Sequence, residues 1–220
     1  MTNEARSLAE VRENVEKTCG ISRRKPHDVT LIAVSKTQSI SKIEPLLLAG
    51  HRTFGENRVQ EAMEKWPELR TRFSEVELHL IGQLQSNKAD QAVQIFDFIH
   101  SLDRPSLAEA LAKAMEKNGR RVPCFIQVNV GEEPQKGGCS LANLAALVEQ
   151  CSSLSIPIIG LMCIPPSGIE PAPFFALLEA LADENNLGSL SMGMSSDYET
   201  AIMLGATHIR VGTALFGERS

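Results

Sequence analysis

The stretch Val29-Thr30-Leu31-Ile32-Ala33-Val34-Ser35-Lys36 decides the fold. Its apolar run, rich in β-branched residues, predicts a buried strand. The strand runs into Ser35-Lys36-Thr37-Gln38, where an open dinucleotide-binding sheet usually has a Gly-x-Gly-x-x-Gly turn. The stretch therefore indicates an α/β protein of another kind, with a lysine at the carboxyl end of its first strand.

Seven similar runs follow, separated by turn residues and by segments with helical periodicity. Strands alternating with helices imply parallel strands joined by crossover helices, and eight such units predict a closed (β/α)₈ TIM barrel. An open doubly wound sheet is the alternative. We also expect an extra N-terminal helix over Thr2–Thr18, and helices over Ser106–Asn118 and Leu141–Cys151. The expected strands are Val29–Val34, Thr53–Phe54, Val76–Ile81, Phe96–Leu102, Cys124–Val130, Ile158–Ile164, Leu190–Met192 and His208–Val211.

The composition is that of an ordinary globular chain. Apolar residues make up 43% and charged residues 22% of the 220 residues, which excludes wholesale disorder. The net charge of -5 argues against a basic protein that binds nucleic acid or a membrane surface. No linker divides the chain, and the Pro-rich stretch Pro165–Pro173 fits a loop after the sixth strand. A single domain over residues 1–220 is expected.

The cysteines and the N-terminus bear on location. Five cysteines, with no Cys-x-x-Cys pair, disfavour both a disulfide framework and a zinc site. Residues 1–6 lack the apolar core of a signal peptide, and no apolar run reaches the roughly 18 residues of a membrane helix. We expect a cytoplasmic protein. No His-x-x-x-His or Cys/His cluster indicates a metal.

Lys36 is the most informative candidate for chemistry. In a (β/α)₈ barrel, functional groups lie at the carboxyl ends of the strands, and Lys36 closes an apolar strand. Because an ammonium group is costly to bury, a lysine held there can become a neutral nucleophile that forms a Schiff base with an aldehyde. The alternative is a strand-end lysine that extends to solvent.

The turns after the seventh and eighth strands predict a phosphate site. Barrels often hold phosphate with these two loops, which here read Met192-Gly193-Met194-Ser195 and Gly212-Thr213-Ala214. Glycine lets backbone N–H groups approach an anion, and Ser195 and Thr213 add hydroxyl donors. Ordinary turns with capping hydroxyl groups would give the same pattern.

Arg210 lies between Ile209 and Val211 on the eighth strand. Strand alternation points its guanidinium into the barrel mouth if the two aliphatic side chains face the helices. A buried arginine needs a partner, which could be Asp197, Glu199 or the ring nitrogen of a ligand. Because arginine stays protonated, it would donate to that nitrogen and leave the ring a weak electron sink.

Other polar residues near the strand ends are less specific. Asn57 could cap a helix starting near Arg58, and His79 could be a core histidine. Lys136, in a loop with a mobile composition, could be a second amine near the mouth or a solvated side chain. A lysine, a phosphate cradle and an arginine on one rim suit pyridoxal 5'-phosphate (PLP), whereas a phosphosugar aldolase would need only the first two.

Six stretches of the chain resemble the PLP homeostasis proteins, which are relatives of the N-terminal barrel of alanine racemase (PLP fold type III). They are, in chain order, Leu31-Ile32-Ala33-Val34-Ser35-Lys36, Phe54-Gly55-Glu56-Asn57, His79-Leu80-Ile81-Gly82-Gln83-Leu84-Gln85-Ser86-Asn87-Lys88, Gly160-Leu161-Met162, Leu190-Ser191-Met192-Gly193-Met194-Ser195 and Arg210-Val211-Gly212-Thr213-Ala214-Leu215-Phe216-Gly217. Each stretch alone is weak, but together and in order they are highly specific. Gln83 stands where many relatives have proline, at what reads as a helix start.

The resemblance implies a PLP-binding barrel with PLP as its cofactor. By this resemblance Lys36 carries PLP as a Schiff base, and Arg210 faces the pyridine nitrogen. The resemblance also implies that the phosphate is held by Ser195, Gly212 and Thr213, with Ser191 and Met194 close by. It implies that the pyridine ring is lined by Asn57 and His79.

Two function classes remain open for such a barrel. The family implies a PLP carrier for vitamin B6 homeostasis with no catalytic residues, which buffers PLP or delivers it to apo PLP-dependent enzymes. The alternative is a PLP-dependent racemase or decarboxylase, and a Schiff-base aldolase is a weaker third. Alanine racemase-like enzymes use a second domain and a tyrosine base from the partner subunit, and the only tyrosine here is Tyr198. We therefore expect a monomeric carrier without a second domain.

Overall fold

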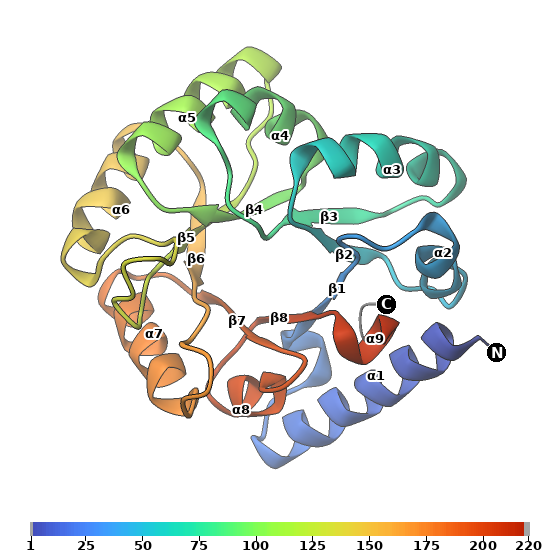
Figure 1. Cartoon of the computed structure of the whole chain (residues 1–220). Coiled ribbons are helices and arrows are strands. Elements are labelled where there is room, and N and C mark those ends of the chain that lie inside the picture. Colours follow the sequence, from blue (N-terminus) through green and yellow to red (C-terminus); the bar gives the residue numbers. More distant parts are fainter. Residues whose placement is uncertain (1, 218–220) are drawn as a thin grey trace.

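The computed structural model describes residues 2–217 as a closed barrel of eight parallel strands (Figure 1). The predicted fold class is confirmed, and the open sheet is wrong because β8 pairs with β1. The strands are β1 (Thr30–Val34), β2 (Thr53–Glu56), β3 (Glu77–Leu80), β4 (Phe98–Leu102), β5 (Cys124–Gln127), β6 (Ile158–Met162), β7 (Ser189–Met194) and β8 (His208–Val211). Residue 1 and residues 218–220, the ends of the expected single domain, lie outside the described residues.

Helices surround the barrel, and most follow a strand. The α-helices are α1 (Asn3–Ile21), α2 (Ile40–Leu48), α3 (Val59–Arg72), α4 (Ala89–Ile95), α5 (Pro105–Asn118), α6 (Leu144–Ser153), α7 (Ala172–Glu184), α8 (Tyr198–Met203) and α9 (Thr213–Phe216). Short 3₁₀ helices cover Pro26–Asp28, Ser86–Lys88 and Leu141–Asn143. None of the described helices is long and apolar enough to cross a membrane.

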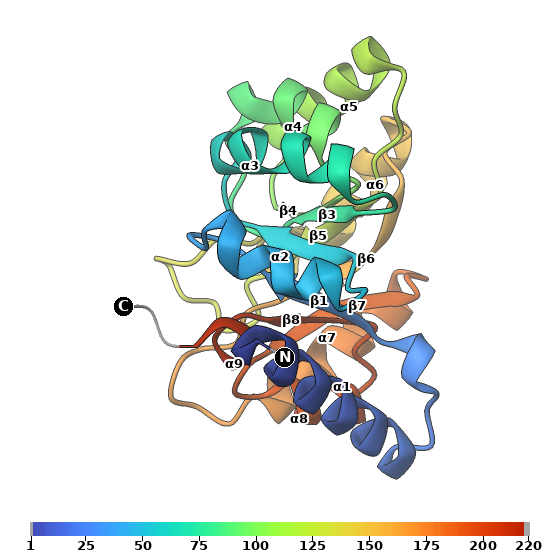
Figure 2. The same cartoon turned by 90° about the vertical axis from the view of Figure 1, so that its right-hand side faces the viewer.

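The extra N-terminal helix is present and begins as its sequence suggests. The Thr2 hydroxyl accepts a hydrogen bond from the Ala5 N–H at 3.3 Å, which caps the first turn of α1. Its buried face, spaced by three and four residues, includes Leu8, Val11 and Val15. This face packs against α8, α9 and α2, so α1 covers the seam where β8 meets β1 (Figure 2).

Five strands end at other residues than expected: β2 at Glu56, β3 at Leu80, β5 at Gln127, β6 at Met162 and β7 at Met194. The second strand continues through Gly55 and Glu56, because these residues pair with His79 and Leu80 of β3. A Cβ at Gly55 would lie 2.8 Å from Ile32 Cγ2, so only glycine fits without a shift. The fifth strand stops at Gln127. Val128 still donates to Met162 O of β6 at 2.8 Å, but it also forms a bridge with Cys139, and the Asn129 N–H donates to Cys139 O at 2.9 Å.

The interior of the barrel is filled by a layer of rings. His79, Phe98, His100, Phe125 and His208 come from β3, β4, β5 and β8, and neighbouring ring centroids lie 4.2 to 6.4 Å apart. Strand alternation sends the residues between them, such as Leu78 and Ile99, outward into the core against the helices. The layer closes the barrel below its carboxyl end, which leaves that end to form a site.

Candidate functional site

A cavity of about 660 Å³ opens at the carboxyl ends of the strands. Long segments after β5 and β6 project at the same end of the molecule as α9 (Figure 2). The cavity is lined by residues from the β1, β2, β3, β6, β7 and β8 ends: Val34, Lys36, Gln38, Asn57, Ile81, Ile164, Met194, Ser195, Ser196, Arg210, Gly212, Thr213, Ala214 and Gly217. Seven of the nine predicted site residues therefore meet in one cavity: Lys36, Asn57, Met194, Ser195, Arg210, Gly212 and Thr213.

Lys36 is positioned by the turn that follows β1. Its side chain is partly buried and lines the cavity. The next residue, Thr37, has a positive φ of 62°, which is uncommon outside glycine and makes the chain turn sharply. The backbone before the lysine is bonded to β2, since Ser35 N–H donates to Gly55 O at 2.9 Å, and the turn is closed by Gln38 N–H, which donates to Ser35 O at 3.1 Å.

The turns after β7 and β8 converge on one hydroxyl group. The Ser195 Oγ accepts the N–H of Gly212 at 3.1 Å and that of Ala214 at 3.4 Å. The β7 turn is closed by Asp197, whose Oδ1 accepts the Met194 N–H at 2.6 Å. Two backbone N–H groups that converge on one oxygen atom are the ingredients of an anion site.

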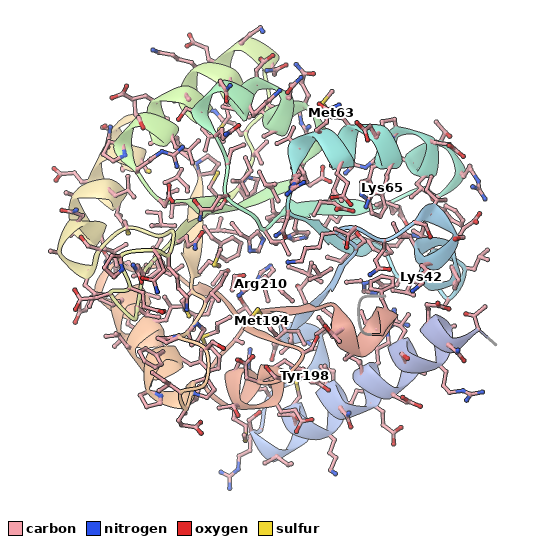
Figure 3. All side chains as sticks on the ribbon, in the orientation of Figure 1. Lys42, Met63, Lys65, Met194, Tyr198 and Arg210 are labelled. Atoms are coloured by element: carbon pink, nitrogen blue, oxygen red, sulfur yellow. The ribbon has the colours of Figure 1, made fainter. Side chains whose placement is uncertain are left out.

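Arg210 is buried under the cavity and is held from two sides (Figure 3). Its Nη1 donates to Ser191 Oγ at 2.6 Å, and its Nη2 donates to Cys163 O at 2.9 Å. Burial lowers the pKa of the guanidinium from its usual value, and the neighbouring Cys163 and Asp197 oppose the shift. Within the described chain the recorded partners of Arg210 are thus a hydroxyl and a carbonyl, and the ion pair considered with Asp197 or Glu199 is not formed.

His79 and Ser191 are placed below the cavity and not along it. The His79 ring stacks on Phe98 at 4.5 Å, and Ile81, two residues further along the same face, lines the cavity in its place. Ser191 joins Arg210 to His100, whose Nδ1 lies 2.8 Å from Ser191 Oγ and whose Nε2 lies 2.9 Å from His79 Nδ1. Burial holds the pKa of His79 and of His100 well below the usual range. Both rings are therefore neutral, and Arg210 is the charged member of this hydrogen-bonded chain.

Asn57 lies beside the cavity and makes no capping bond among the described residues. Helix α3 begins at Val59 with Arg58 in the cap position, and no side chain caps it. The backbone of Asn57 is packed against Gly82, where a Cβ would lie 2.4 Å from Asn57 O. The close approach of these two strand ends fixes Asn57 at the rim.

Sequence reasoning missed a buried ion pair beside Lys36. The fully buried Glu56 Oε1 lies 2.8 Å from Lys65 Nζ, and it also accepts from Ser35 Oγ and Trp66 Nε1. An acidic residue inside a short apolar strand was the available signal, because a buried carboxylate needs a partner. Within the described residues no group of three or more His, Cys, Asp or Glu side chains could hold a metal ion.

The fold and the cavity define a barrel protein of the alanine racemase N-terminal type. The model of that family, described as "Alanine racemase, N-terminal domain", matches residues 7–220. Within this class, the chain belongs to the pyridoxal phosphate homeostasis protein family. It is 40% identical to the "Pyridoxal phosphate homeostasis protein" of Aquifex aeolicus over 99% of both chains. It is 36% identical to the protein of the same name from Escherichia coli K12, over 100% of this chain and 98% of that one.

Solved structures agree with this family assignment. PipY of Synechococcus elongatus, described with PLP bound, is 42% identical and superposes with a TM-score of 0.86 over 97% of this chain and 100% of that one. Alanine racemase from Bartonella henselae is only 17% identical, with a TM-score of 0.72 over 97% of this chain and 59% of that one. This second likeness shows the shared barrel fold alone.

Proposed function

We propose that the protein binds PLP at this cavity and serves vitamin B6 homeostasis as a carrier of the cofactor. PLP supplies an aldehyde, which condenses with a primary amine and releases one water. Lys36 is the amine that would hold it as a Schiff base. The observation that carries the proposal is the meeting of Lys36, Arg210 and the Ser195 turn in one cavity.

The residues present fit the cofactor at both ends. The N–H groups of Gly212 and Ala214 already converge on one oxygen atom, Ser195 Oγ, as donors to a phosphate must. Thr213 and Met194 lie beside this point in the cavity wall. Arg210 would donate to the pyridine nitrogen, while Ser191 and Cys163 O hold its guanidinium in place. Asn57 lies on the Lys36 side of the rim.

A non-catalytic role is supported by the lining of the cavity. Among the described lining residues, Lys36 and Arg210 are the only ionisable side chains, so no acid, histidine or tyrosine is present there as a second proton carrier. Tyr198 lies on α8 near α1, where its hydroxyl accepts a bond from Asn14 Nδ2 at 3.4 Å (Figure 3). Racemisation needs a base and an acid on opposite sides of the substrate carbon, and decarboxylation needs a proton donor to that carbon, so a lining without a second proton carrier favours a carrier.

The proposed carrier role implies a cellular compartment and a class of partner protein. All five cysteines are free and buried, which suits the reducing cytoplasm that we propose as the compartment. Apo PLP-dependent enzymes are the proposed recipients of PLP, and the protein is proposed to act as a monomeric single domain. Neither nucleic acid nor a membrane is part of this role.

The Schiff base can be tested by absorbance with excess PLP. We expect a visible band in the wild type that borohydride reduces and fixes to the protein, and no such band in Lys36→Ala. Lys136→Ala is the matched control, because Lys136 pairs with Glu133 and donates to Pro165 O at 3.1 Å. A reducible band in Lys36→Ala, or none in the wild type, would refute the assignment.

The carrier role can be tested separately with apo-enzymes. Loaded wild-type protein should restore the activity of an apo PLP-dependent enzyme, and should do so without converting amino acids itself. Sustained racemisation or decarboxylation by the pure loaded protein would instead support the enzyme alternative.

A further inference from the structure

We propose that Lys65 and Glu61 of α3 form a clamp that fixes the Lys36 turn, so that both act as positioning residues for the Schiff-base amine. The clamp consists of three residues: Lys65 and Glu61, which contact the turn, and the buried Glu56, which pairs with Lys65. This inference rests on the proposed function, because it assigns what sets the position of Lys36 in PLP binding.

Lys65 contacts the turn on both sides of Lys36. Its Nζ donates to Ser35 O at 3.0 Å and to Gln38 O at 3.4 Å. Ser35 directly precedes Lys36, and Gln38 follows it by two residues. One ammonium group therefore ties together the two ends of the turn that carries Lys36.

Glu61 contacts the middle of the same turn. Its Oε1 accepts the Thr37 N–H at 2.5 Å and a bond from Lys65 Nζ at 2.8 Å. Thr37 has the positive φ of 62° that β-branched residues rarely adopt, so this backbone needs outside support. A charged acceptor bonded to its N–H supplies that support.

Glu56 holds Lys65 against the barrel wall. Its carboxylate is fully buried on β2 and lies 2.8 Å from Lys65 Nζ, whose side chain is 12% exposed. Figure 3 places Lys65 on the inner side of α3, outside the strands. Lys65 is not among the described residues that line the cavity, so it acts through the backbone of the turn. Burial raises the pKa of Glu56, and the nearby Lys65 opposes this shift.

The clamp acts on one half of the cavity only. The Ser195 and Gly212 donors come from β7 and β8 and make no recorded bond with the clamp among the described residues. Loosening the turn should therefore weaken covalent capture of an aldehyde through Lys36. It should leave the binding of a phosphate-bearing ring without an aldehyde nearly unchanged.

The binding test compares two probes, PLP and pyridoxine 5'-phosphate, which lacks the aldehyde. In Glu61→Ala and Lys65→Met we expect the dissociation constant for PLP to rise about tenfold, as expected for a lost charge-assisted bond, with that for pyridoxine 5'-phosphate within about twofold. Lys65→Arg should recover most of the PLP affinity, because arginine can still donate to several oxygens. Lys42→Met, at a partly buried lysine of α2, is the matched control.

Hydrogen exchange of the ligand-free protein tests the clamp without the cofactor. The Thr37 amide should exchange at least about tenfold faster in Glu61→Ala and Lys65→Met than in the wild type, while the β1 amides stay protected. Lys65→Met could fail to fold because Glu56 is left unpaired. In that case the double variant Glu56→Gln/Lys65→Met takes its place, and the single variant Glu61→Ala is measured as before.

The outcomes separate the clamp from the proposed function. Equal loss of affinity for both probes, unchanged affinity for PLP, or unchanged Thr37 exchange would each overturn the clamp. A wild type that forms no reducible band with PLP, but whose Thr37 amide is released in the variants, would refute PLP capture and leave the clamp intact.

Discussion

Ser195 is the residue on which the anion-binding half of the proposed site depends. Its hydroxyl oxygen is the point where the Gly212 and Ala214 N–H groups meet, so it joins the β7 turn to the β8 turn. A phosphate at this point would accept hydrogen bonds from these two N–H groups, and also from the Ser195 hydroxyl. Under the proposed function, we expect the side chain to contribute to affinity for the charged end of the ligand and not for its ring.

The variant Ser195→Ala should weaken PLP binding by about 1.5–3 kcal/mol, the worth of a hydrogen bond to a charged group, or tenfold and more in the dissociation constant. Pyridoxal, which has no phosphate, should bind the variant and the wild type equally. Titration calorimetry with both ligands measures the difference. A similar loss for pyridoxal would show that Ser195 shapes the whole cavity.

Single residues could be predicted where strand alternation and position in the barrel decide their environment. Lys36, Asn57 and Arg210 follow from these rules, since each belongs to a strand end that faces the mouth. His79 could not be placed by them, because the depth at which the ring layer ends depends on the packing of side chains from several strands. Lys65 was missed since its partners come from β1, β2 and α3, and no local pattern joins them.

Among the elements, the end of β7 depends on a glycine. Gly193 has a φ of 91°, and a Cβ there would lie 2.5 Å from the Ala201 Cβ of α8. The helix approaches this closely because Asp197 bends the chain back onto β7 through the Met194 N–H. The positions of Met194 and Ser195 thus follow from the packing of α8.

The variant Gly193→Ala should lower the free energy of unfolding by about 1–3 kcal/mol, because it adds both backbone strain and a steric clash. Gly20→Ala is the control, since Gly20 is in α1 with nothing within 4 Å of its added Cβ. That change should leave stability unchanged or raise it slightly. Urea unfolding without ligand measures both, and equal stability of the two variants would contradict the packing argument.

All eight strands were predicted near their true positions, because apolar runs between turn signals are strong local patterns. Their ends were less certain for a physical reason. Gly55 and Glu56 have low strand propensity and are held in β2 by pairing with β3, and Val128, just past the end of β5, pairs with Cys139. These tertiary contacts override the local preference.

At the scale of the whole molecule, buried neutral histidines make the fold sensitive to acid. Burial lowers the pKa of His208 to about 4, with a smaller effect from Arg210, and that of His51 to about 4, with Arg12 adding to the effect. In the unfolded chain histidine has a pKa of about 6.5. Between pH 6.5 and 4 the unfolded state therefore binds protons that the folded state does not.

Stability should accordingly be complete above about pH 6.5 and fall as the pH drops toward 4. His208 and His51 should each account for up to about 3 kcal/mol near pH 4, at about 1.36 kcal/mol for each unit of pKa shift. Urea unfolding at several pH values measures the slope. His208→Gln should reduce it, and the exposed His27→Gln should not. A wild type equally stable at pH 7 and 4.5 would contradict the argument.

The pairing of β8 with β1 sets when in its synthesis the protein can first hold a ligand. The ribosome makes Lys36 early, but Ser195, Gly212 and Thr213 emerge only as the last strands leave the exit tunnel. A growing chain thus contains the proposed Schiff-base amine of Lys36 long before it contains the proposed anion donors. If those donors hold the phosphate as proposed, retention of PLP reports that the barrel has closed, and a chain stopped before β8 keeps Lys36 but lacks Gly212 and Thr213.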